Sequence, residues 1–142
     1  MNDILHLQKL SVGTETVADL AAWQNMKQEQ SGKLPQHVTR MWPKRADEIL
    51  SGGSMYWVIK GSIQCRQRIV RFDEAIGADG IRRCAIVLEP ELIRVAPTIK
   101  RPFQGWRYLK PADAPVDLPK GREAEEPLPE TLNAALAEIG LL

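Results

Sequence analysis

Residues 55–72 read MYWVIKGSIQCRQRIVRF, which is the strongest strand pattern in the chain. Aromatic and β-branched side chains dominate residues 55–60, and such side chains favour strands. Gly61 and Ser62 then predict a bend or bulge, after which polar and apolar residues alternate over 63–72. Alternation with period two is typical of a strand that has one buried face. We therefore predict two successive strands that form the centre of a sheet.

The second of these strands has two faces of different character. One face carries Ile63, Cys65, Gln67 and Ile69, and the other carries Gln64, Arg66, Arg68 and Val70. Two residues apart on a pleated strand, Arg66 and Arg68 would lie about 7 Å from each other, close to the spacing of successive phosphates in a nucleic-acid backbone. The pattern makes both arginines candidate phosphate ligands.

The elements before this stretch include two helices. A strand is expected over 3–10 and a helix over 17–30, starting at a capping box of Thr16 and Asp19 and ending at Gly32. A short strand over 37–42 follows. Pro43 then begins a second helix, which ends at Gly52-Gly53, because proline suits the first turn of a helix.

Further strands are expected after residue 72. Their predicted positions are 81–88, 92–95 and 105–109, and Pro97 is expected to end the second of them. Five to seven strands with two or three short helices predict an α+β fold, built on a small curled mixed sheet or pseudo-barrel.

A chain of 142 residues is close to the usual size of one domain. We expect a single α+β domain over 1–110, a proline-rich strap over 111–130 and a C-terminal helix over 131–142 that packs on the same domain. The sequence leaves the oligomeric state open.

Composition excludes several classes of protein. Hydrophobic residues make up 44% and charged residues 26%, so wholesale disorder is excluded. No apolar run approaches the ~20 residues of a membrane span, and no signal peptide is recognisable, so no membrane partner is expected. Cys65 and Cys84 do not form a CxxC pair, which favours two buried thiols in the reducing cytoplasm.

Motifs for dedicated chemistry are missing from the sequence. The phosphate-binding patterns GxxxxGK[ST] and GxGxxG, the zinc motif HExxH and the serine-hydrolase pattern GxSxG are all absent. The two histidines, His6 and His37, are isolated, so no metal and no cofactor is predicted.

Charge is distributed unevenly behind a net charge of +1. Residues 33–110 carry fifteen Lys and Arg against seven Asp and Glu, whereas 1–32 and 111–142 are both acidic. A basic middle region attracts phosphate, a carboxylate ligand or nucleic acid. The same charges also fit a solvated sheet face neutralised by the acidic end of the chain.

Aromatic residues cluster in this basic region. Aromatic rings beside arginines offer stacking for a base and positive charge for its phosphates, although tryptophans such as Trp42 and Trp57 equally fit a core. The candidate ligand-binding residues are Arg40, Trp42, Lys44, Arg45, Arg66, Arg68, Trp106 and Tyr108.

Four segments carry a resemblance to a known family. They are DLAAW (19–23), HVTRMWPKR (37–45), ILSGGSMYWVIKG (49–61) and RPFQGWRYL (101–109). In these segments the chain resembles a family of short bacterial proteins, mostly alphaproteobacterial, described only as a domain of unknown function. The resemblance spans most of residues 1–118 and implies no activity.

Residues 44–60 also resemble the helix-to-strand segment of the PUA-like superfamily, in particular its ASCH branch, with Ile49-Leu50-Ser51-Gly52 at the helix end. This resemblance implies a pseudo-barrel that binds RNA or modified nucleobases. Some ASCH proteins are amidohydrolases that act on acetylated cytidine, with Lys and Thr just after the glycine. Here Ser54 and Met55 stand at those places, so the catalytic residues do not carry over.

The leading hypothesis is a PUA-like domain that binds RNA or a nucleotide-like ligand. Arg40, Lys44 and Arg45 would contact phosphates, and Trp42, Trp106 or Tyr108 would stack on a base. The alternatives are a small-molecule enzyme, such as a hydrolase of modified nucleosides with Glu48 as its acid, and a protein-interaction module with exposed aromatics.

Overall fold

The computed structural model describes residues 4–119, so the predicted helix over 131–142 and the strap beyond 119 lie outside the described residues. The strands are β1 (His6–Leu10), β2 (Gln36–Thr39), β3 (Ser54–Ile59), β4 (Ser62–Ile76), β5 (Arg82–Leu88), β6 (Ile93–Ile99) and β7 (Trp106–Leu109). The helices are α1 (Val17–Ser31) and α2 (Ala46–Leu50), and a 3-10 turn η1 (Pro111–Asp113) follows β7.

The strands form one mixed sheet, in the order β2-β5-β4-β3-β1-β7, with β6 also paired to β4. Only β1 and β3 are parallel among these pairs. The long strand β4 forms hydrogen bonds along both of its edges. On one edge the Ile69 N–H donates to the Gly53 carbonyl, just before β3, and on the other the Glu89 N–H, between β5 and β6, donates to the Arg68 carbonyl. The α+β prediction is confirmed, and in the described part of the chain the sheet stays open between β2 and β7.

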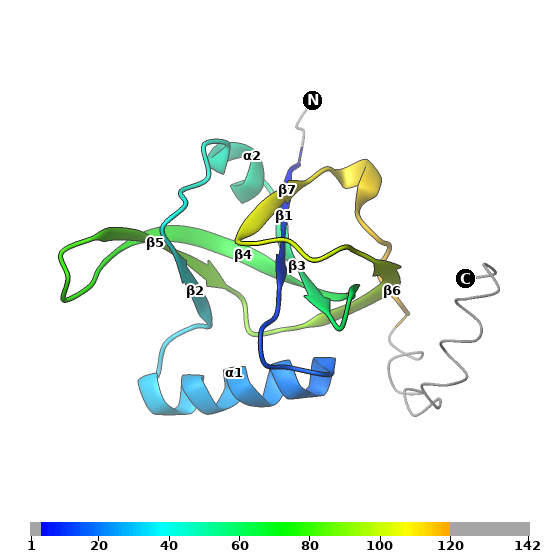
Figure 1. Ribbon diagram of the computed structural model, residues 1–142, viewed down its shortest axis with the longest axis horizontal. Coiled ribbons are helices and arrows are strands. Elements are labelled where there is room, and N and C mark those ends of the chain that lie inside the picture. The colour runs from blue at the N-terminus through cyan, green and yellow to red at the C-terminus, as the bar shows by residue number, and fades with distance from the viewer. Residues whose placement is uncertain (1–3, 120–142) are drawn as a thin grey trace.

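The main core lies on the interior face of this curled sheet. Its buried members include Leu7, Met55, Ile69, Ile86 and Trp106. Figure 1 shows α1 at one end of the sheet and α2 at the opposite end. Burial of apolar side chains at about 25 cal/mol per Å² supplies most of the stabilisation of such a core.

Helix α1 begins and ends as its sequence predicts. The Thr16 side chain accepts from the Asp19 N–H, and the Asp19 carboxylate accepts from the Thr16 N–H. Gly32 adopts a left-handed conformation with φ 70° and donates its N–H to the Gln28 carbonyl, which is the usual role of glycine after a helix. Both ends are therefore fixed by local residues.

A second, smaller core covers the outer face of β3. Tyr56, Val58, Ile63, Val95 and Leu109 form it. The first part of the predicted strap lies along β6, because Asp117 forms a bridge with Val95 and two hydrogen bonds of 2.7 Å with Arg66.

Several boundaries differ from the sequence-based prediction. Strand β1 begins at His6 rather than at 3, and β2 ends at Thr39 rather than at 42. Strand β6 continues through Pro97 to Ile99, because a register shift on β4 between Ile63 and Cys65 makes a bulge in which proline is tolerated. Helix α2 begins at Ala46 rather than at Pro43, because Arg45 has non-helical backbone angles, φ −105° and ψ 44°. The Lys44 and Arg45 N–H groups donate to the Tyr108 hydroxyl.

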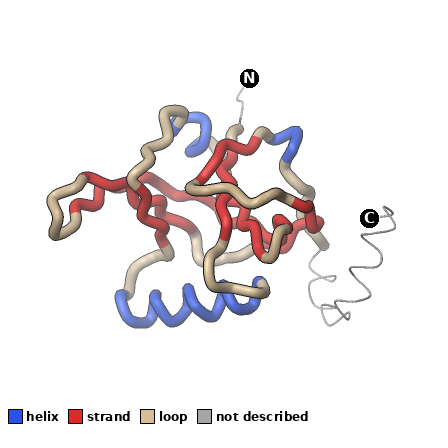
Figure 2. Tube along the Cα trace, viewed as in Figure 1, coloured by secondary structure: helices blue, strands red, loops and turns tan. Residues whose placement is uncertain are grey.

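The β4–β5 hairpin is a further difference, since β4 extends to Ile76 where the prediction ended at 72. In Figure 2 its tip projects from the rest of the fold. None of the helices within residues 4–119 has the length and apolar composition needed to cross a membrane.

Candidate functional site

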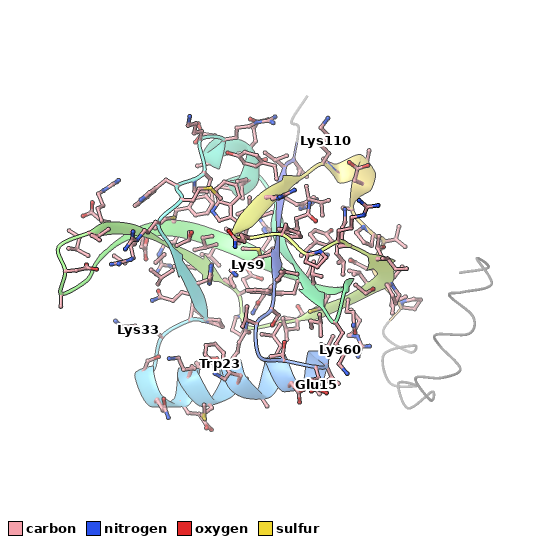
Figure 3. All side chains as sticks on the ribbon, viewed as in Figure 1. Lys9, Glu15, Trp23, Lys33, Lys60 and Lys110 are labelled. Atoms are coloured by element: carbon pink, nitrogen blue, oxygen red, sulfur yellow. The ribbon has the colours of Figure 1, made fainter. Side chains whose placement is uncertain are left out.

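A cavity of about 700 Å³ opens between α1 and the interior of the curled sheet. Its lining consists of residues 9–14, side chains of α1, residues 33–37, and Trp57 and Leu88. We call it the α1 cavity. In Figure 3 Lys9, Trp23 and Lys33 are labelled, and they come from three different segments around this space. The volume is in the usual range for sites that bind small molecules.

The charged residues that line the α1 cavity in the described part of the chain are cations. Among residues 4–119, Lys9, Lys27 and Lys33 line it, and no aspartate or glutamate does. Within residues 4–119 none of these lysines takes part in an ion pair. Burial lowers the pKa of Lys9, because an ammonium group loses solvation beside the sheet interior. A bound anion would restore that lost stabilisation.

Aromatic rings provide the flat surfaces of the cavity. Trp57 of β3 is buried, and the His37 ring lies edge-on to it at 6.4 Å between centroids. Trp23 of α1 is 51% exposed, and the Lys27 Nζ lies 5.3 Å from its ring centroid. An exposed indole next to a cation can stack on a planar ligand.

A buried amide pair fixes one wall of the cavity. The Gln67 Oε1 accepts from the Gln24 Nε2 and from the Trp57 Nε1, both at 3.0 Å. The Gln67 Nε2 donates to the Gln24 Oε1 at 2.7 Å and to the Glu89 carbonyl at 2.8 Å. These bonds occupy both donors and both acceptor positions of the Gln67 amide. They leave the Gln24 amide one N–H donor and one acceptor position. Gln24 lines the cavity in a single orientation.

Burial, and after it the neighbouring charge of Lys9, lowers the pKa of His37 to about 4 from its ordinary value of 6.5. The unfolded chain therefore binds a proton between these pH values that the folded protein does not, so the free energy of unfolding should fall as pH drops from 6.5 towards 4. Solvent screens the partly buried ring, so we expect a loss of about 1–2 kcal/mol, measured by urea unfolding.

The control for this pH dependence is His37→Gln. The pKa of His6 is also lowered by burial and by Arg66, so wild type and variant share that contribution. The difference between their stabilities should change over this pH range only through His37. Parallel stability curves for the two proteins would contradict the assignment.

The predicted aromatic residues gather at another place, around β7. Trp106 is buried and donates from Nε1 to the Met41 carbonyl at 2.8 Å. The Tyr108 hydroxyl accepts from the Lys44 and Arg45 N–H groups at 2.9 and 3.3 Å. These bonds join the segment after β2 to β7 across the open side of the sheet. The polar atoms of Trp106 and Tyr108 therefore hold β7 to the segment between β2 and α2.

The predicted cations near these rings also have protein partners. Arg45 makes two hydrogen bonds to Glu48, at 2.6 and 2.7 Å, and lies 5.8 Å from the Tyr108 ring centroid. The half-buried Trp42 ring is covered at 4.0 Å by Arg82, a residue that the sequence did not single out. Arg40 and Lys44 are exposed, and their binding role stays a prediction.

The structure places Arg66 on the other side of the sheet. Trp106 and Tyr108 pack against the interior core, whereas Arg66 pairs in register with Tyr56 on the outer face. Arg66 also donates to the Ser54 Oγ at 2.9 Å in addition to its bonds with Asp117. Arg68 is exposed on β4. The eight predicted residues are thus divided between two faces.

Sequence reasoning missed the α1 cavity, although its signal was present. Lys9 continues the inward face of Leu5 and Leu7, and Gln67 stands between the inward residues Cys65 and Ile69. A polar residue among inward-facing apolar residues indicates either a buried hydrogen-bond network or a binding site. Gln67 forms such a network, and Lys9 lines the cavity. Among residues 4–119 no three His, Cys, Asp or Glu side chains form a group that could hold a metal ion.

Comparison with known proteins identifies a family. The family described as "Protein of unknown function (DUF1489)" matches residues 7–142, a range that includes every residue around the α1 cavity. No curated protein and no solved structure is found to be similar. Because the match covers almost the whole chain, this protein belongs to that family.

Proposed function

We propose that the protein binds a nucleotide-like anionic ligand, free or as part of an RNA, in the α1 cavity. The observation that supports this proposal is a hollow lined by three lysines and by Trp23 and Trp57, with no carboxylate among the lining residues that the structure describes. Lysines neutralise phosphate, and aromatic rings stack on bases.

The remaining polar groups fit the same class of ligand. Gln24 is held by Gln67 and keeps a donor and an acceptor for a base edge, the kind of contact by which glutamine recognises adenine. His37 stays neutral above its pKa of about 4, so its ring can stack or donate one hydrogen bond without adding charge.

The PUA-like resemblance of residues 44–60 points to the same class, because α2 leads into β3 there as a helix leads into a strand of the pseudo-barrel. A PUA-like fold therefore remains part of the proposal. So does a cytoplasmic setting, since Cys65 and Cys84 are buried free thiols. A hydrolase is not proposed, because Glu48 binds Arg45 and does not line the α1 cavity.

The direct test is titration with adenosine, guanosine, cytidine and uridine 5′-monophosphates and with a mixed single-stranded RNA octanucleotide. Calorimetry and tryptophan fluorescence give the affinities. Lys9→Gln should weaken binding about tenfold, because it removes a charged hydrogen bond worth ~1.5 kcal/mol from a half-buried place. Lys33→Gln should weaken it about threefold, because an exposed charge is screened.

Lys110→Gln is the matched control, since Lys110 is exposed and lies at the opposite end of the molecule from α1 (Figure 3). It removes the same charge and should leave affinity within about twofold of wild type. Equal losses in Lys9→Gln and Lys110→Gln would place the ligand elsewhere. No saturable binding of any of these probes by the folded protein would refute the proposed function.

A further inference from the structure

The positive charge around the α1 cavity ends sharply at the segment before β2. A second cavity of about 450 Å³ shares Lys33, Leu34 and Gln36 with the first, and Asp73 and Glu74 line it on the far side. Its additional cation is Arg71. The Arg71 Nε contacts both carboxylate oxygens of Asp73 at 3.0 and 3.1 Å, and Glu74 forms an ion pair with Arg82, so cations and carboxylates compensate each other here.

The opposite end of the α1 cavity is bounded in a similar way. Its lining ends at Thr14, and Glu15 follows directly. Glu15 lies 3.3 Å from Lys60, and the capping residue Asp19 accepts from the Glu15 N–H. Two carboxylates therefore stand beyond the cavity at the start of α1.

A nucleic-acid strand needs a different electrostatic surface. It carries one phosphate per nucleotide, and proteins that hold single strands follow the backbone with a continuous positive groove. A strand that left the α1 cavity past Lys33 would find no continuing positive groove, because Asp73 and Glu74 already neutralise Arg71 and Arg82. A strand that left at the other end would meet the Glu15–Lys60 ion pair and Asp19.

We infer that the ligand of the α1 cavity is a free mononucleotide, whose negative charge ends within the cavity, rather than a segment of RNA. This inference rests on the proposed function. A terminal phosphate carries up to two negative charges near neutral pH, whereas each internal phosphodiester carries one. Three lysines that form no ion pair within residues 4–119 lie in one hollow, and they match the terminal phosphate better.

The experiment compares the four 5′-monophosphates with a single-stranded octanucleotide that has hydroxyl groups at both ends. At least one monophosphate should bind ten times more tightly than the octanucleotide, and the corresponding nucleoside without phosphate should bind at least ten times more weakly than the monophosphate. Equal or tighter binding of the octanucleotide would overturn this inference and leave the proposed function standing. Failure of every probe to bind would refute both.

A charge variant tests the stated cause. Asp73→Asn combined with Glu74→Gln removes the carboxylates beside Lys33 and should strengthen octanucleotide binding at least threefold, while monophosphate binding stays within twofold. Asp113→Asn removes an exposed carboxylate from η1 and should change neither affinity. If the double variant leaves octanucleotide binding unchanged, neutralisation of Arg71 and Arg82 by Asp73 and Glu74 is not what excludes the strand, and the inference fails.

Discussion

Replacing Gly53 by alanine is expected to destabilise the protein by about 3 kcal/mol or more, or to prevent folding, because the added methyl group has no space. The new Cβ would overlap the carbonyl oxygen of Leu5 and lie 2.7 Å from that of Ile49. Both obstacles are backbone atoms, which cannot turn away as a side chain can. Urea unfolding of the purified variant measures the loss.

Gly61→Ala provides the matched control for this effect. Gly61 has φ +77°, and an added Cβ would meet no atom within 4 Å, so backbone strain alone should cost about 1 kcal/mol. A Gly53→Ala protein that is as stable as Gly61→Ala would show that the chain at Leu5 moves aside. That result would contradict the tight junction between the N-terminal segment and the turn after α2.

Gln67→Leu is expected to cost about 3–4 kcal/mol, since unsatisfied buried polar groups each cost ~1–3 kcal/mol and three groups lose their partner. The three groups are the Trp57 indole N–H, the Gln24 amide and the Glu89 carbonyl. Gln67 is completely buried, so water does not replace these bonds without opening the core. Chemical denaturation gives the stability, and tryptophan emission reports the changed surroundings of Trp57.

Gln64→Leu on β4 is the control, because the half-buried Gln64 donates one hydrogen bond, to the Ile59 carbonyl. Its cost should stay below about 1 kcal/mol. Adding Gln24→Leu to Gln67→Leu should recover part of the loss, since the double variant removes the unpaired Gln24 amide as well. Strictly additive losses would show that the two amides do not act as a pair.

Much of the fold could be predicted from local patterns. Thr16 and Asp19 predict the start of α1, Gly32 predicts its end, and the capping geometry confirms both. The alternation in residues 63–72 places Cys65 and Ile69 in the core, as observed. Pro97 misled the prediction because proline ends a strand only where its N–H would be needed, and the bulge on β4 removes that need.

The site was harder to predict than the fold. Trp106 and Tyr108 have the aromatic and polar character of ligand-binding residues, but their polar atoms are bound to the segment between β2 and α2. Their sequence could not show this, because the partners lie more than sixty positions away. Arg66 was likewise predicted to bind phosphate, but its guanidinium group binds Asp117, which lies 51 positions away.

The sequence by itself determined which segments form strands and helices, the ends of α1 and most inward positions of the strands, because caps, turns and alternation depend on neighbouring residues. Ile63 is an exception: it was predicted on the face of Cys65 but packs in the smaller core with Tyr56, because the pairing of β4 with β6 shifts between Ile63 and Cys65. Only the tertiary structure decided which polar side chains share a cavity. Lys9, Gln24, His37 and Trp57 meet because the sheet curls and α1 packs across its end. That arrangement is set by contacts between distant segments, which no local pattern encodes.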